Sequence, residues 1–269
     1  MIIAEFCGNH NGDRSLLFNM IAHAAEAGAT FCKIQSFFAD DLSSEWEHDH
    51  TRSKQLELSW EDHRVFVATC ENHKITPMTT VYTTKYAQDL WNAGFKWVKI
   101  GSPQATNEQL IRTYVELGFQ VIVSTGGHKL QSLPRIHPLA GVLHCVSKYP
   151  CSPYETNLIR MVEIKKYFPS APVGFSSHVD PTQRDWAIPL KLASFMGATF
   201  IEVHFTLLSR EKTKDGNVSL DHDQLSEICQ FDRLEPADKR AYMGWFGTLM
   251  SGQEQKERDL ISKYAKRWK

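Results

Sequence analysis

The sequence predicts an α/β fold, a single (β/α)8 TIM barrel followed by a C-terminal helical tail. At 269 residues the chain has the length of one such barrel. Short apolar runs alternate eight times with longer segments of helical periodicity, which is typical of βα units around a parallel sheet. Polar side chains follow the apolar runs, at the strand ends where barrels carry their active sites. We assign residues 1–236 to the barrel and expect residues 237–269 to form a helical extension packed on it.

Eight apolar runs are the expected strands. They are Ile2–Phe6, Phe31–Gln35, Thr76–Thr80, Trp97–Gly101, Gln120–Ser124, Gly141–Cys145, Val173–Ser176 and Phe200–His204.

Helical segments are expected between these strands. Ser15–Gly28 places its apolar side chains on one face, and Gly28 suits the cap at its end. Ser59 suits an N-cap with Asp62 three residues later, before a helix from Trp60 to about His73. Further helices are expected after Asn107, after Asn157, within Pro181–Gly197 and from Asp221 to Phe231.

Two polar segments, residues 39–59 and 207–220, are expected to be loops. The first is long for a connection inside a compact domain, and such connections are often functional or disordered. Its His48, Asp49 and His50 could form a metal cluster, but a solvated surface loop is the preferred interpretation.

Composition excludes several classes of function. The chain is 42% hydrophobic and 23% charged, with a net charge of -1, so no broad positive field attracts nucleic acid or an anionic membrane. The six cysteines have no CxxC spacing, which argues against a zinc knuckle or a disulfide framework and favours reduced core residues. Without a basic leader or an apolar run long enough for a membrane span, we expect a cytoplasmic protein that acts on small molecules.

Side chains at the strand ends suggest an anion site beside a metal. Lys33 and Lys99 with nearby hydroxyls suit a phosphate and a carboxylate, although each lysine could equally form a core ion pair with Glu5 or Glu202. His178 follows the seventh expected strand, and His204 is the last residue of the eighth. Either histidine alone would favour a core role, but the pair suggests a shared divalent ion.

Several motifs in one order resemble those of the sialic acid synthases, phosphoenolpyruvate-dependent sugar acid synthases that include N-acetylneuraminate synthase. The matching stretches are Ala4–Gly12, Ala27–Ala29, Cys32–Gln35, Val98–Ser102, Ser124–Gly126, Leu143–Pro150, Gly174–His178, Gly197–Ala198 and Ile201–Thr206. Their shared order is far more specific than any one of them.

The resemblance implies a barrel transferase that joins phosphoenolpyruvate to a sugar aldehyde. The expected metal ligands are His178 and His204, with Mn²⁺ as the ion and Mg²⁺ or Co²⁺ as alternatives. Residues expected to take part in catalysis are Glu5, Lys33, Lys99 and Asp215, and those expected to bind substrate are Gln35, Thr80, Ser102, Gln104, Ser147, Tyr149 and Ser176. The metal would polarise the aldehyde and the lysines would stabilise the anionic groups, while Glu5 or a metal-bound water would manage a proton.

Three positions depart from the family pattern. Gln104 replaces a glutamate, Ser147 an asparagine and Ser177 an aspartate. Because the first two positions face the sugar in the family, the acceptor could differ from N-acetylmannosamine and be a related amino or deoxy hexose. The family's C-terminal antifreeze-like domain has no counterpart in these 269 residues, so a homodimer or a separate polypeptide could complete the site.

Two other functions stay open at this point. One is a different metal-dependent aldolase or hydrolase, which the paired lysines disfavour. The other is a barrel that binds phosphoenolpyruvate or a sugar phosphate without turnover, which Gln104 and Ser147 favour slightly.

Overall fold

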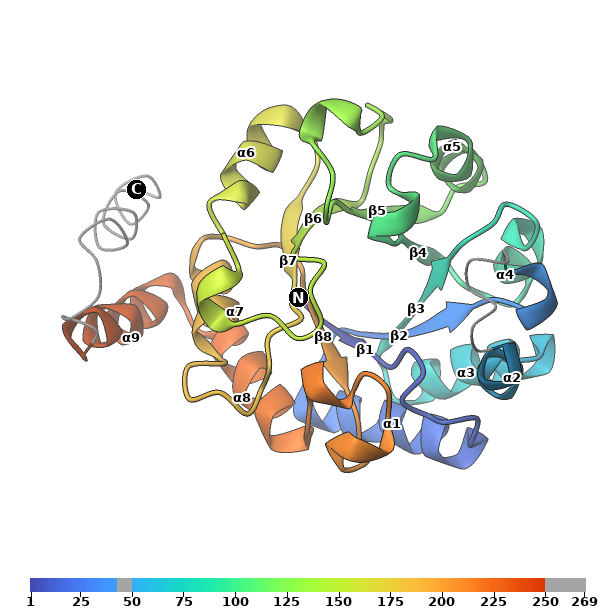
Figure 1. The fold of residues 1–269 in the computed structure, drawn as a ribbon, viewed down its shortest axis with the longest axis horizontal. Helices are drawn as coiled ribbons and strands as arrows, with labels where there is room; N and C mark the ends of the chain where they lie inside the picture. Colours follow the sequence, from blue (N-terminus) through green and yellow to red (C-terminus); the bar gives the residue numbers. More distant parts are fainter. Residues whose placement is uncertain (43–49, 250–269) are drawn as a thin grey trace.

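Eight parallel strands close into a barrel in the computed structural model, which describes residues 1–42 and 50–249 (Figure 1). Each strand pairs with the next one in sequence, and the pairing of the first with the eighth closes the ring. The strands are β1 Ile2–Glu5, β2 Phe31–Ser36, β3 Thr76–Val81, β4 Trp97–Ile100, β5 Gln120–Ser124, β6 Gly141–Cys145, β7 Val173–Ser176 and β8 Ile201–Phe205. The predicted (β/α)8 barrel is confirmed.

All eight predicted strands are present, with ends that differ by no more than one residue. The last strand is shifted, because it begins at Ile201 and continues to Phe205. Phe205 is held in the sheet by pairing with Leu220 of a short ninth strand, β9 Ser219–Leu220. That strand lies in the segment 207–220, so the prediction that this whole segment is a loop was wrong.

Helices surround the barrel on its outer face (Figure 1). They are α1 Arg14–Ala27, α2 His50–Leu56, α3 Trp60–Asn72, α4 Ala87–Asn92, α5 Glu108–Glu116, α6 Arg160–Tyr167, α7 Ile188–Phe195, α8 His222–Arg233 and α9 Pro236–Leu249. The predicted capping box is confirmed, since Ser59 accepts from the Asp62 backbone N–H and Asp62 accepts from that of Ser59. Gly28 ends α1 with φ of 97°, as expected.

One loop prediction was wrong, and two predicted helices are present but shorter than expected. Helix α2 lies inside the segment 39–59 that was assigned to a loop. Helix α6 begins only at Arg160, because Asn157 takes a left-handed φ of 45° and the chain turns there. Helix α7 is shorter than Pro181–Gly197, because the Asp180 carboxylate binds the backbone N–H and hydroxyl of Thr182 and forms a local turn.

The proposed metal cluster of the loop falls largely outside the described residues, which omit His48 and Asp49. His50 lies in α2 and its Nε2 is 2.9 Å from the Asp40 carboxylate.

The inside of the barrel is layered by strand periodicity. The layer nearer the amino ends of the strands is apolar and buried. It consists of Ile3, Phe31, Met78, Ile122, Leu143 and Phe200. Glu5 and Lys33 follow Ile3 and Phe31 by two residues, so they face inward in the next layer, towards the carboxyl ends of the strands. The apolar layer thus supports a charged one.

Helix α9 follows the barrel and contacts α7, where Lys191 Nζ donates to the Tyr242 hydroxyl at 2.6 Å. Residues 250–269 of the predicted extension lie outside the described residues. Within the described part of the chain, each helix is too short or too polar to cross a lipid bilayer.

Candidate active site

A cavity of about 660 Å³ opens at the carboxyl ends of the strands. Its size suits small-molecule substrates. Nearly all the predicted site residues line it: Glu5, Lys33, Gln35, Thr80, Lys99, Ser102, Ser147, Tyr149, His178, His204 and Asp215. Strand register explains part of this gathering, because Glu5 pairs with Lys33 on one side and with His204 on the other, and Thr80 pairs with Lys99.

Two predicted residues lie beside the cavity and do not line it. The Gln104 side chain accepts from Asn107 Nδ2 at 3.1 Å, in a 3-10 turn after β4. Ser176 is buried, and its hydroxyl donates to Glu202 Oε1 at 2.9 Å. Ser176 therefore positions Glu202, while Gln104 belongs to the rim.

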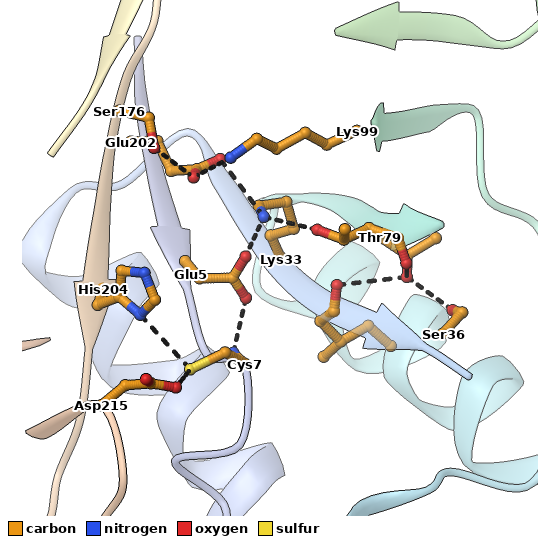
Figure 2. Close-up of polar contacts among 12 residues, drawn as sticks. Glu5, Cys7, Lys33, Ser36, Thr79, Lys99, Ser176, Glu202, His204 and Asp215 are labelled. Carbon is orange, nitrogen blue, oxygen red and sulfur yellow. Dashed lines mark hydrogen bonds and ion pairs between the residues drawn. The ribbon is translucent and has the colours of Figure 1, made fainter. Parts of the chain in front are cut away.

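Two lysines and two glutamates form a buried ion-pair network (Figure 2). Lys33 contacts the carboxylates of Glu5 and Glu202, and its Nζ also donates to Thr80 Oγ1 at 2.8 Å. Lys99 contacts Glu202 from the opposite side of the barrel. The sequence left two roles open for these lysines, a core ion pair or a place in the ligand cavity. Lys33 and Lys99 form ion pairs and also line the cavity, so the two roles coexist.

Electrostatic interactions favour the charged forms of Lys33 and Glu202. Burial alone would lower the pKa of Lys33, but the carboxylates of Glu202 and Glu5 raise it above its ordinary value. Burial alone would raise the pKa of Glu202, and the ammonium groups of Lys33 and Lys99 hold it well below the usual range. Lys33 and Glu202 are therefore both charged at neutral pH, and Lys99 contacts the same Glu202 carboxylate beside the cavity.

A narrow polar corner adjoins Lys99. Ser102 Oγ accepts from the Gly126 backbone N–H at 3.0 Å. A Cβ at residue 126 would lie 2.9 Å from that Oγ and collide with the Ser147 hydroxyl, so both serine side chains would have to move to admit a larger residue. The corner offers hydroxyls and backbone beside a charge, as a phosphate or carboxylate requires.

The two histidines come from the carboxyl ends of the neighbouring strands β7 and β8 and lie side by side in the cavity wall, with ring centroids 5.5 Å apart. His178 Nδ1 lies 2.7 Å from the Val146 carbonyl, so this nitrogen carries the proton and Nε2 keeps a lone pair. Burial and the neighbouring His204 lower the pKa of His178 to about 3, and burial lowers that of His204. Both rings are therefore neutral at pH 7, as metal ligation requires.

Cys7 and Asp215 complete a set of donors around His204. Cys7 Sγ lies 3.4 Å from His204 Nδ1 and donates to Asp215 Oδ2 at 2.9 Å (Figure 2). One donor atom from each of these three residues lies within 4.8 Å of the other two. Nitrogen, sulfur and carboxylate oxygen are all common ligands of divalent ions, so the residues present fit a metal.

Comparison with known proteins decides the family. The profile of the NeuB family matches residues 20–236. The chain belongs to the NeuB family. The resemblance to sialic acid synthases is thus confirmed, and so is the expectation of an enzyme of this kind.

Three similar NeuB-type proteins span most of the chain. An N,N'-diacetyllegionaminic acid synthase of Legionella pneumophila is 31% identical over 85% of this chain and 70% of its own. One of Campylobacter jejuni is 29% identical over 98% of this chain and 83% of its own. The crystal structure of an N-acetylneuraminic acid (sialic acid) synthetase from Leptospira borgpetersenii in complex with citrate has a TM-score of 0.80 at 25% identity, covering 100% of this chain and 92% of that one.

Sequence reasoning missed several residues that line this NeuB-family cavity. Arg52 and Ser53 come from α2, in the segment assigned to a solvated loop, and Lys214 comes from the segment after β8. Cys7 was grouped with the core cysteines. Its position two residues after Glu5, within the stretch Ala4–Gly12, was the signal that could have identified it.

Proposed function

We propose that this NeuB-family enzyme condenses phosphoenolpyruvate with an N-acetylmannosamine-like or related amino or deoxy hexose. The products would be a sialic-acid-like 3-deoxy-2-keto acid and phosphate. One observation carries the proposal: two buried lysines and two neutral histidines face the same cavity, together with Glu5 and Asp215. The relatives named as legionaminic and sialic acid synthases support it.

The lysine side of the cavity would hold phosphoenolpyruvate. Lys33 and Lys99 supply charge, and Thr80, Ser102 and the Gly126 corner supply directed hydrogen bonds. Lys33 and Lys99 are already fixed by Glu5 and Glu202, so little side-chain freedom is lost when the anion binds. The same charges would stabilise the departing phosphate.

The histidine side would hold a divalent ion, for which the family resemblance suggests Mn²⁺, with Mg²⁺ or Co²⁺ as alternatives. His178 and His204 would bind it, with Asp215 beside them. When bound, such an ion supplies Lewis-acid polarisation of the sugar aldehyde.

Glu5 is our choice for the proton transfer that accompanies water addition. It lies between Lys33 and His204 in the strand register, where the anion side and the histidine side meet. Its Oε1 accepts from the Cys7 backbone N–H at 2.6 Å, which fixes the carboxylate in place.

The sugar would lie nearest to the rim. Tyr149 stacks on His178 with a centroid separation of 3.7 Å and is 56% exposed, so its ring can contact a bound sugar. Gln35 and Ser147 line the same cavity. We propose that these residues, with Gln104 beside them, select the acceptor, and that a second copy of the chain or another polypeptide could complete this side.

Phosphate release tests the proposal. We expect release from phosphoenolpyruvate that requires both a divalent ion and one substituted hexose in a panel of aldoses. If no sugar supports turnover, while phosphoenolpyruvate still raises the melting temperature by mass action, the protein binds its ligand without catalysis.

A further inference from the structure

We propose that Cys7 is a protein ligand of the divalent ion, together with His204 and Asp215, and that this centre therefore prefers Zn²⁺, Fe²⁺ or Co²⁺ to Mn²⁺ and Mg²⁺. The inference rests on the metal dependence proposed above and changes the identity of the ion expected there.

The positions of the donor atoms carry the inference. Ligand atoms around one tetrahedral zinc-type ion, at about 2.0–2.3 Å from it, are roughly 3.3–3.8 Å apart. Cys7 Sγ and His204 Nδ1 are 3.4 Å apart. Asp215 Oδ2 is 2.9 Å from Cys7 Sγ because it accepts the thiol proton, and loss of that proton would let the two atoms separate.

The backbone around Cys7 fixes the thiol in this position. Cys7 has a positive φ of 35°, which is uncommon for a residue with a side chain and is found mostly where the surroundings impose it. Its N–H donates to Glu5, the last residue of β1, and its side chain is buried. The sulfur is therefore held beside His204 before any ion arrives.

His178 is compatible with the same centre. Its Nδ1 is occupied by the Val146 carbonyl, so only Nε2 is available to an ion. The centroid of its ring lies 5.5 Å from that of the His204 ring. Strand β8, which carries His204, lies between β7, which leads to His178, and β1, which leads to Cys7. Cys7 adds a sulfur ligand to the expected histidine pair.

Ligand chemistry then sets the preference for the ion. Thiolate favours softer ions such as Zn²⁺, whereas Mn²⁺ and Mg²⁺ favour sites made of oxygen donors. On binding, the Cys7 S–H bond breaks, its proton leaves to the solvent and a sulfur–metal bond forms, without any change of oxidation state.

Cobalt provides a direct test, because a thiolate bound to Co²⁺ gives a charge-transfer absorption band that nitrogen and oxygen ligands do not give. The full chain, stripped with a chelator and titrated with Co²⁺, is expected to show this band with one equivalent of bound ion. Cys7→Ser and Cys7→Gly should lose the band. Glycine tolerates positive φ, so the second variant keeps the test valid if serine disturbs folding.

Cys145→Ser is the matched control. Cys145 also lines the cavity, and its Sγ lies 3.7 Å from His178 Nδ1. The band should persist in this variant. A second group of possible ligands, His23, Glu26 and His222 between α1 and α8, contains no thiol, so Co²⁺ bound there adds nothing to the band.

Metal competition gives an independent measurement. Cys7→Ser should weaken Zn²⁺ binding at least roughly tenfold, while Mn²⁺ binding changes much less. The inference is overturned if Co²⁺ binds without the band, if the band survives both Cys7 variants, or if it is lost in Cys145→Ser. In those cases the proposed metal dependence still stands. If the wild-type chain binds no Co²⁺, Zn²⁺ or Mn²⁺, the inference and that dependence fail together, and phosphate release then decides separately whether condensation occurs.

Discussion

Glu202 joins the two lysines of the cavity into one electrostatic unit. It contacts Lys33 and Lys99, and Ser176 donates to it from the neighbouring strand. The sequence left two roles open for these lysines, a core ion pair or a ligand contact. Burial explains why both hold, since ammonium groups kept inside a barrel for an anion need a carboxylate partner in the absence of that anion.

Replacing Glu202 with glutamine tests this coupling through stability. The variant leaves Lys99 without its carboxylate, so the free energy of unfolding at neutral pH should fall by about 3–5 kcal/mol. The pKa of Glu202 is lowered in the folded state, so its contribution is present above its ordinary pKa of 4.5 and is lost as the pH falls through the folded-state value. The difference from wild type in urea unfolding should therefore shrink below pH 4.5.

Glu61→Gln is the control, because Glu61 forms an exposed pair with Arg64 on α3 and should matter little at any pH. A Glu202 effect that is absent at neutral pH, or that is unchanged in acid, would contradict the coupling.

Lys99→Met tests whether this single lysine binds the anionic substrate. The methionine keeps the length of the side chain and removes the charge. We expect the KM for phosphoenolpyruvate to rise by at least roughly tenfold, the usual effect of losing a desolvated charge contact, while the KM for the sugar changes little. Lys96→Met is the control, because Lys96 is exposed and lies over the Trp91 ring. Equal KM values for phosphoenolpyruvate in wild type and Lys99→Met would remove this lysine from the anion site.

Residue types at strand ends were readable from the sequence, because period-two strands and a closed ring place them in one layer. Glu5, Lys33, Lys99 and His204 illustrate this. Cys7 and Arg52 were not readable. Cys7 depends on a left-handed turn after β1, and Arg52 depends on how α2 packs over the cavity, and neither leaves a periodic signal.

Among the helices and strands, α2 departs most from the prediction, because its segment was expected to be a surface loop. Its segment is polar and amphipathic periodicity is weak, so only tertiary contacts reveal the helix. Packing places Arg52, Ser53 and Leu56 at the cavity, which turns a predicted surface loop into part of the site wall.

Arg52→Ala should therefore weaken binding of the anionic substrate. A guanidinium at the rim steers and holds phosphate or carboxylate groups, so we expect a rise of roughly threefold to tenfold in the KM for phosphoenolpyruvate, reduced at high salt. Arg64→Ala, on the exposed side of α3 and paired with Glu61, is the control. If both variants behave alike, α2 does not form part of the site.

Strand β7 depends on a glycine for its packing. A Cβ at Gly174 would lie 2.6 Å from Leu143 Cδ2 and collide with the Phe200 carbonyl. Gly174→Ala should thus lower the free energy of unfolding by about 1–3 kcal/mol. At Gly141 the Cβ would meet side-chain atoms and no backbone, namely the edge of the Phe200 ring at 3.0 Å and Ile122 Cγ1 at 3.6 Å, so Gly141→Ala should cost less in the same urea titration. The reverse order would show that the two strands pack differently.

The overall fold was easier to predict from the sequence than the individual elements or site residues. Eight alternating units, caps such as Ser59 and Gly28, and the length of the chain determine a closed barrel, because few other arrangements bury eight apolar strands. The segment after β8 was the exception, since the two-residue strand β9 forms only against β8. The division at residue 236 stays a prediction.

The proposed reaction forms a carbon–carbon bond between phosphoenolpyruvate and a sugar in this cavity. Phosphoenolpyruvate carrying carbon-13 at its methylene carbon follows that bond directly by nuclear magnetic resonance. With a divalent ion and the accepted hexose, the label should appear in the ring-closing keto acid as a methylene joined to two carbons, in amounts equal to the phosphate released. Label recovered as the methyl group of pyruvate, with phosphate released and the sugar unchanged, would show that the protein hydrolyses phosphoenolpyruvate and forms no carbon–carbon bond.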